Sequence, residues 1–259
     1  MKHAIAALVV GVGAVAGAAD AGVIFGVATY STFGTMSLYR IDASTGAASL
    51  VGSTGLRQIN GITFDGSTLW AHTTAGDLYK LDVNSGAATL FGVQNLTLPE
   101  GDIAFAGGSS AFVVNGGELG RVAITSGAYT AVGPLGALAD DVSGLAFDGS
   151  GRLLGYSKNG AGEDSLVSID VASGAASTVG LTGVGSAAAV GGLAFDPDSA
   201  SLFLTDGGTL YGVNALTGAA TFIGAHGVPG FSGIAVVPGP GAAALGVAGL
   251  LAVARRRRS

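Results

Sequence analysis

Short runs of alternating apolar and polar residues, each ended by Gly, Asp, Asn or Ser, fill the chain between residues 22 and 237. In one stretch these runs occupy residues 61–64, 68–71, 78–81 and 88–91. Alternation with a period of two is typical of half-buried β-strands, and the residues between the runs favour tight turns. The pattern predicts four short strands joined by turns in this stretch.

Two motifs recur along the chain and alternate with each other. Leu-Tyr-Arg-Ile-Asp at 38–42, followed by Ser-Thr-Gly-Ala-Ala at 44–48, has related sequences that begin at Leu78, Leu119, Leu166 and Leu210. Gly-Ile-Thr-Phe-Asp at 61–65 has counterparts that begin at residues 102, 144, 192 and 233, spaced by 41, 42, 48 and 41 residues. Four strands per unit at this period predict the blades of a β-propeller. A solenoid is the competing architecture, but its repeats are usually shorter and need distinct capping units.

The two ends of the repeated region complement each other. The first unit starts at residues 23–29 with the equivalent of a second strand, and the chain finishes with an unpaired first strand at 231–237. Ring closure pairs these segments and removes both open edges. We therefore predict an all-β fold, a five-bladed β-propeller of four-stranded blades over residues 22–237. A C-terminal strand completes the first blade, and hydrophobic helices flank the domain at the N- and C-terminal ends.

Composition and charge narrow the class of protein. Glycine contributes 47 of 259 residues, and 49% of the chain is hydrophobic, which argues against disorder and suits a β protein with many turns. The chain has no cysteine, which excludes disulfide scaffolds, thiolate zinc sites and cysteine nucleophiles. Residues 22–238 hold 16 acidic and 6 basic residues, a net charge of about −10. We expect no nucleic-acid partner for so acidic a body.

The N-terminal segment has the parts of a secretory signal peptide. A basic start at Lys2 precedes the apolar run 4–16, and Ala19-Asp20-Ala21 fits a small-residue cleavage site. The alternative, a buried N-terminal helix, must accommodate three glycines between residues 11 and 17. Residues 1–21 are therefore predicted to be a signal peptide, and the mature chain to be exported.

The C-terminal segment, residues 238–259, is predicted to be a membrane-sorting tail. Pro238-Gly239-Pro240 precedes an apolar run at 241–254, and the chain ends on four arginines and a serine. A basic cluster stays cytoplasmic, which leaves the body outside. The sorting residues are Pro238, Pro240, Arg255, Arg256, Arg257 and Arg258.

The tail resembles the PEP-CTERM sorting signal of exported bacterial proteins, although Gly239 stands where that family usually has glutamate. The resemblance implies recognition by an exosortase-type membrane protease, with the tail in the inner membrane before processing and an address in the cell envelope or outside the cell. An ordinary tail anchor gives the same topology. The repeats before the tail are similar to those of WD40 and NHL propellers.

Repeated aspartates follow the strands on one predicted face. The turns between first and second strands and between third and fourth strands lie on that face, and Asp and Gly there satisfy backbone groups and supply positive φ. We interpret these residues as a repeated turn device and not as catalytic groups. They are Asp42, Asp65, Asp82, Asp148, Asp170 and Asp196.

Non-repeating residues gather on the opposite predicted face, where position-specific function is expected. Asp102 replaces the glycine that starts the innermost strand elsewhere, so its carboxylate should point into or near the central channel. His72 and His226 are expected in surface loops, and Trp70 is expected to pack within its blade. The candidate binding residues are Asn60, His72, Glu100, Asp102, Asp140, Asp141 and His226.

The acidic candidates suit two chemistries. Oxygen ligands from Glu100, Asp102, Asp140 and Asp141 would suit Ca²⁺, but the sequence has no dense calcium-loop motif, so a solvated acidic rim without a cofactor is the favoured interpretation. Asp102 with Asp140 or Asp141 would give the carboxylate pair of a hydrolase.

Binding or structural display of an unidentified extracellular ligand is the favoured function. The alternative is a propeller hydrolase or lyase acting on polysaccharide or a lactone. The sequence contains a single tryptophan and six tyrosines, which disfavours a cleft that stacks sugars.

Overall fold

The structure is a computed structural model that describes residues 22–28, 34–93, 101–136, 141–158, 164–185 and 191–239. All regular elements in these ranges are β-strands. The predicted signal peptide lies outside the described residues, as do both predicted flanking helices and all of the tail except Pro238 and Gly239. No helix in the described ranges has the length and hydropathy needed to cross a membrane.

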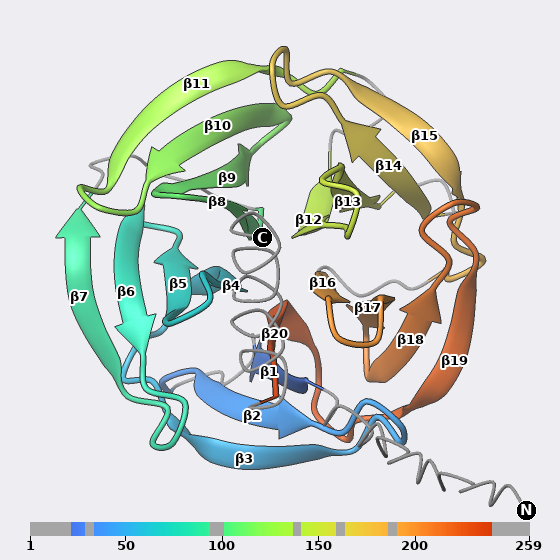
Figure 1. Cartoon of the computed structure of the whole chain (residues 1–259). Coiled ribbons are helices and arrows are strands. Elements are labelled where there is room, and N and C mark those ends of the chain that lie inside the picture. The colour runs from blue at the N-terminus through green and yellow to red at the C-terminus, as the bar shows by residue number, and fades with distance from the viewer. Residues whose placement is uncertain are drawn as a thin grey trace, which may run out of the picture.

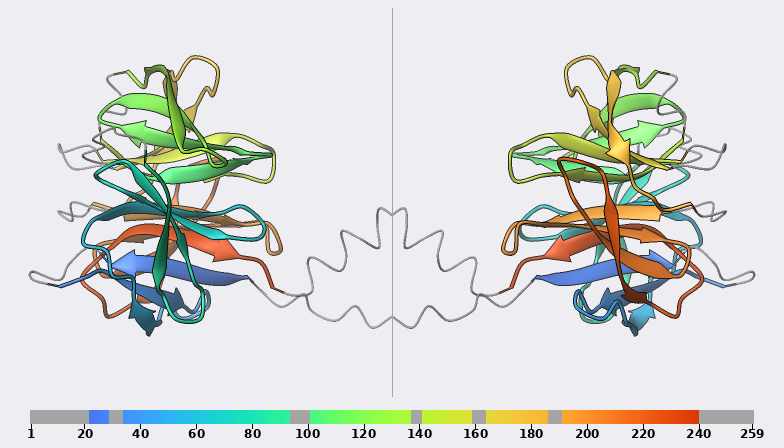
Figure 2. Two further views of the ribbon diagram at one scale, coloured as in Figure 1. Left: turned by 90° about the vertical axis from the view of Figure 1, so that its left-hand side faces the viewer. Right: turned by 90° about the vertical axis from the view of Figure 1, so that its right-hand side faces the viewer.

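Five four-stranded antiparallel sheets are arranged around a central axis as the blades of a propeller (Figure 1). The side views show the ring of blades edge-on, as a disc that is shorter along its axis than across it (Figure 2). From the axis outward, blade 1 is β20 (Phe231–Val237), β1 (Val23–Ala28), β2 (Ser37–Ile41) and β3 (Ala48–Ser53). Blade 2 is β4 (Ile59–Phe64), β5 (Leu69–Thr73), β6 (Asp77–Leu81) and β7 (Ala88–Val93). Blade 3 is β8 (Ile103–Gly107), β9 (Ser110–Asn115), β10 (Glu118–Ala123) and β11 (Ala128–Pro134). Blade 4 is β12 (Val142–Phe147), β13 (Leu153–Ser157), β14 (Ser165–Ile169) and β15 (Ala176–Leu181). Blade 5 is β16 (Gly191–Asp196), β17 (Ser201–Asp206), β18 (Thr209–Val213) and β19 (Ala220–Ala225).

The ring closes in blade 1, where the last strand of the domain pairs with the first. β20 runs antiparallel to β1, with Phe25 opposite Ala235 and Gly26 opposite Ile234. The predicted propeller, its five blades and its closure by the C-terminal strand are confirmed. Closure pairs β1 with β20, so that β1 does not present an open edge and blade 1 has four strands like the other blades.

The hydrophobic core is divided among the gaps between neighbouring blades. Each of the five clusters of buried side chains draws its members from two adjacent blades. Trp70, for example, belongs to a cluster with Leu78 of its own blade and with Ile103 and Val113 of blade 3. Trp70 therefore packs within its own blade, as expected, and also against blade 3. Because both faces of every inner strand contact another blade, these strands are apolar on both sides.

A close backbone contact links one blade to the next at four of the five junctions at the rim, and it explains the repeated Ser/Thr-Gly motif. The outer-strand glycine of one blade lies against the hairpin glycine of the following blade, as Gly52 does against Gly86 and Gly224 against Gly46. A Cβ on Gly224 would come within 1.9 Å of the Thr45 carbonyl oxygen. The Gly224–Gly46 contact joins blade 5 to blade 1, so it is part of the closure.

Aspartate-capped turns occupy one face of the ring, which we call the turn face. Asp42 Oδ1 accepts hydrogen bonds from the backbone N–H of Ser44 at 2.8 Å and of Thr45 at 2.9 Å, and Asp82 does the same with Asn84 and Ser85. The Ser44 hydroxyl also donates to Asp42 Oδ1 at 2.6 Å, and this bond together with the two backbone bonds holds the pKa of Asp42 down at about 2. The interpretation of the repeated aspartates as turn residues is confirmed. The opposite face, with the connections between second and third strands and the links between blades, is called the loop face.

Candidate functional site

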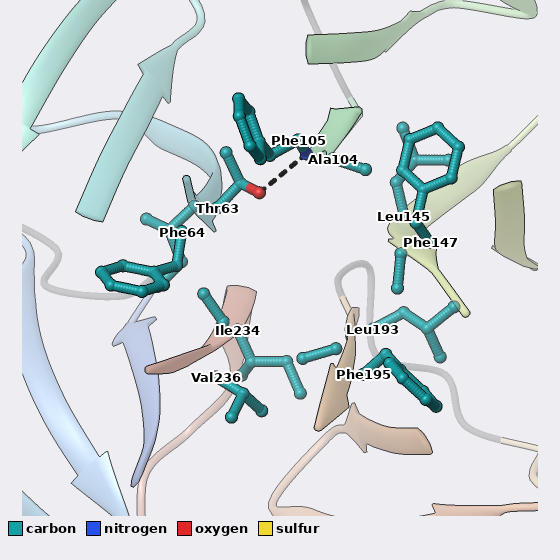
Figure 3. A pocket seen from close by; sticks show the side chains of 14 residues that line it. Thr63, Phe64, Ala104, Phe105, Leu145, Phe147, Leu193, Phe195, Ile234 and Val236 are labelled. Atoms are coloured by element: carbon teal, nitrogen blue, oxygen red, sulfur yellow. Dashed lines mark hydrogen bonds between the residues drawn. The ribbon is translucent and has the colours of Figure 1, made fainter. Parts of the chain in front are cut away.

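The innermost strands surround a cavity of about 110 Å³ on the propeller axis. Its lining is the second half of each of these strands, so the cavity lies toward the turn face. Phe64, Phe105, Phe147 and Phe195 occupy equivalent positions, and Val236 takes their place in blade 1. Figure 3 shows the phenyl rings directed away from the middle of the cavity, which leaves the strand backbones facing the axis.

One side-chain hydrogen bond joins two blades in the wall of this cavity. The Phe105 backbone N–H donates to Thr63 Oγ1 at 2.9 Å, drawn as the dashed line in Figure 3. The equivalent of Thr63 in the other blades is alanine, at Ala104, Ala146, Ala194 and Ala235. Thr63 therefore makes the wall asymmetric at this one level.

Asp102 lies near the propeller axis, at the loop-face end of the cavity, and is fully buried. We call this level of the ring, formed by Asp102 and the equivalent glycines of the other innermost strands, the hub. Its Oδ1 accepts a hydrogen bond from the Ile103 N–H at 2.8 Å, and its Oδ2 accepts one from Leu145 of blade 4 at 3.0 Å. The backbone N–H groups of Leu193 in blade 5 and Ile62 in blade 2 also interact with the carboxylate. Asp102 thus points into the channel and reaches three blades besides its own.

Burial raises the pKa of Asp102 well above its usual range, and the backbone N–H donors around the carboxylate oppose that rise. Desolvation disfavours the charged carboxylate, whereas hydrogen bonds from N–H groups favour it. Asp102 has no surface exposed to solvent, so its carboxyl group interacts only with the protein groups around it.

A second polar cluster lies on the loop face where blades 4 and 5 meet. The Tyr156 hydroxyl donates to Asp164 Oδ2 at 2.5 Å, and the Lys158 ammonium pairs with Asp206 Oδ1 at 2.7 Å. Asp206 Oδ2 is buried and has no hydrogen-bond partner among the described residues. All four side chains are almost fully enclosed. We call them the loop-face cluster, and they hold the ends of β13 and β17 together.

Asp141 is the predicted binding residue that adjoins the loop-face cluster. It is half-buried at the start of β12, and burial raises its pKa, with the Asp164 carboxylate adding to the rise and the Lys158 ammonium opposing it. Asp102 has backbone groups around it, whereas Asp141 has Lys158 and Asp164. The two carboxyl groups that the hydrolase alternative would pair therefore have different neighbours.

The prediction of His72 and His226 as surface loop residues is wrong. His72 lies within β5 and is 1% exposed, because this strand continues to Thr73, two residues beyond the predicted end. His226 lies in the link before β20 and is 3% exposed, with its ring 4.6 Å from that of Phe231. Burial lowers the pKa of each to about 4.

The remaining predicted site residues are placed as follows. Asn60 is half-buried in β4 at the loop face. Glu100 and Asp140 lie outside the described residues, as do the sorting residues Pro240 and Arg255 to Arg258. In the part of the chain that the structure describes, no group of three or more His, Asp or Glu side chains is arranged to hold a metal ion.

Sequence reasoning missed Tyr156 and Asp206, although a signal was present. His72, Tyr156 and Thr205 occupy equivalent positions in their second strands, in register with Gly61, Gly144 and Gly192 of the inner strands. Polar residues at the loop-face ends of second strands therefore mark buried polar positions. No protein-family model matches the chain, and no curated protein matches its sequence.

Proposed function

We propose that this chain is an exported bacterial surface protein whose propeller is a rigid module for binding or display. In this proposal the tail holds or sorts it, and the loop face is directed away from the membrane. The proposed orientation is supported by the position at which the first and last strands of the propeller leave the ring. The sequence supports export through the predicted signal peptide and the basic, apolar tail.

Both ends of the propeller leave it side by side on the turn face. Val23, the first residue of β1, is opposite Val237, the last residue of β20. Beyond this pair, the Gly239 N–H donates to Asp198 Oδ2 at 3.3 Å, in the turn that follows β16. A tail that enters a membrane just after Gly239 brings the turn face toward that membrane. This exit geometry is the observation that carries the proposal.

The arrangement separates two kinds of surface. The turn face has repeated, structurally committed turns, whereas the loop face has the connections that differ between blades and the half-buried Asp141 beside the loop-face cluster. Variable loops on a rigid scaffold are where binding residues usually lie. An extracellular ligand would therefore meet the loop face.

We also propose that the tail is recognised by a sorting protease. Pro238 and Gly239 follow β20 directly and form no helix or strand. The resemblance to PEP-CTERM proteins supports an exosortase-type protease as the partner that processes this tail. A permanent tail anchor would give the same orientation of the propeller.

Single cysteines on the two faces test the orientation, because the chain has no cysteine of its own. Ala75→Cys is in the β5–β6 connection of the loop face, and Ala172→Cys is in the β14–β15 turn of the turn face; both alanines are exposed. On intact cells making the full chain, we expect a small membrane-impermeant maleimide to label both variants. A maleimide attached to a large globular protein should label Ala75→Cys much faster.

The purified protein is the control, since both cysteines should react there at similar rates with either reagent. Labelling of both variants only after cell lysis would contradict export. Equal rates with the large reagent on cells whose protein stays in the membrane fraction, or faster labelling of Ala172→Cys, would contradict the orientation.

A further inference from the structure

The hub is built from five equivalent positions, of which four are glycines and one is Asp102. The glycines are Gly61, Gly144, Gly192 and Gly233, each at the same point of an innermost strand. There is no room for a second side chain at this level. A Cβ on Gly144 would be 2.7 Å from the Leu193 nitrogen, and one on Gly192 would be 2.7 Å from the Ile234 nitrogen. The ring therefore accommodates one small group on its axis.

Backbone N–H groups are directed at that group from several blades. Innermost strands have no neighbour on their axial edge, so this edge presents donors that must find acceptors. Asp102 supplies both of its oxygens to them, through the Ile103 and Leu145 bonds and the additional contacts from Leu193 and Ile62. A planar carboxylate, with two oxygens and about four lone-pair sites, matches this number of donors.

We propose that the propeller hub is a binding site for one small carboxylate, formed by backbone N–H groups of four blades and filled by the chain's own Asp102. The site selects for a planar carboxylate no larger than acetate, because the glycine ring leaves space for a single side chain of the size of aspartate. Filling it closes the axial channel at this level. The cavity of about 110 Å³ lies on the turn-face side of Asp102.

The occupied site also ties the ring together. Ile62, Ile103, Leu145 and Leu193 belong to blades 2, 3, 4 and 5, so one carboxylate joins four blades at the axis. Losing this acceptor would leave buried backbone N–H donors unsatisfied, which costs free energy. A single side chain at the hub therefore contacts backbone groups of four of the five blades.

Asp102→Gly tests the site, because it gives blade 3 the residue that the other four blades already have. In the full chain we expect a lower thermal unfolding midpoint for this variant. Sodium formate should raise that midpoint saturably, toward the wild-type value, whereas sodium chloride at the same ionic strength should not. Wild-type protein, whose site is occupied, should respond equally to the two salts.

Asp196→Gly is the matched control. Asp196 is also buried, but its oxygens bond the Asp198 N–H and the Ser199 hydroxyl in a turn and not in an enclosed ring. This variant should be destabilised with no preference for formate over chloride. If Asp102→Gly is recovered unfolded, refolding in formate should restore the β-sheet circular dichroism signal, and refolding in chloride should not.

Three results would overturn the proposal. They are an unchanged midpoint for Asp102→Gly, an equal response of the Asp102→Gly and Asp196→Gly variants to formate, and failure of formate to restore either the midpoint or the fold. Acetate has the same heavy atoms as the Asp102 side chain beyond Cα, so it should act as formate does. Propionate, which adds a methylene group, should act more weakly than either, and a stronger effect of propionate would contradict the size limit set by the glycine ring.

Discussion

Replacing Gly224 by alanine is expected to lower the free energy of unfolding by about 3 kcal/mol, at the upper end of the usual cost of overpacking. The added Cβ would lie 1.9 Å from the Thr45 carbonyl oxygen. That atom is backbone in the hairpin of blade 1, so it cannot rotate away as a flexible side chain would. Blades 5 and 1 must separate locally, at the seam where the ring closes.

Gly92→Ala is the matched control for this effect. Gly92 has the same position in β7, but a Cβ there would be 3.5 Å from its nearest neighbour, the Ser126 carbonyl oxygen, which is an ordinary contact. Removing a glycine from a strand also reduces the entropy of the unfolded chain, so we expect this variant to be neutral or slightly stabilised. Denaturant unfolding measures both variants. Equal losses in the two would contradict the account of the rim contact.

The second large effect concerns the pH dependence contributed by His72. Both of its ring nitrogens are buried and lack hydrogen-bond partners in the part of the chain that the structure describes, and burial lowers its pKa to about 4 from an unfolded value of 6.5. The unfolded chain therefore binds a proton more readily between these values. This titration has little effect on the stability of the fold above pH 6.5, and it lowers that stability increasingly as the pH drops toward 4. Between pH 7 and 4.5 the loss is about 2.5 kcal/mol.

His72→Leu should remove this dependence. Leucine has a similar size and no polar atoms, so the variant should be about as stable as the wild type at pH 7, and more stable by about 2.5 kcal/mol at pH 4.5. Urea unfolding of both proteins at the two pH values measures the difference. His226 and Asp102 are present in both proteins, so their own titration cancels. Parallel stability curves would show that His72 does not titrate in this range.

The fold could be predicted from sequence because each blade repeats the same local signals. The spacing of the Gly-Ile-Thr-Phe-Asp motif and the unpaired strands at 23–29 and 231–237 were enough to determine blade number and closure. The aspartate turns followed from local chemistry, since Asp42 and Asp82 bond backbone groups only two and three residues away. Such interactions depend little on the rest of the chain.

The polar sites depended on contacts between distant segments and were harder to predict. Asp102 was identified because it breaks a repeated glycine, although its donors come from Leu145 and other blades far along the chain. His72 was misplaced because the end of β5 is buried by neighbouring blades. The Lys158–Asp206 pair joins residues 48 apart that no motif connects.

An engineered disulfide between Val23 and Val237 tests ring closure most directly. The two residues are opposite each other in antiparallel strands, at a Cα separation that a disulfide tolerates, and no native cysteine competes. Val23→Cys with Val237→Cys should form an intramolecular disulfide under mild oxidation in the folded protein, seen by non-reducing electrophoresis and mass spectrometry. Val23→Cys with Leu181→Cys, on blade 4, should not. Absence of the first disulfide, or its formation only between chains, would contradict a closed five-bladed ring.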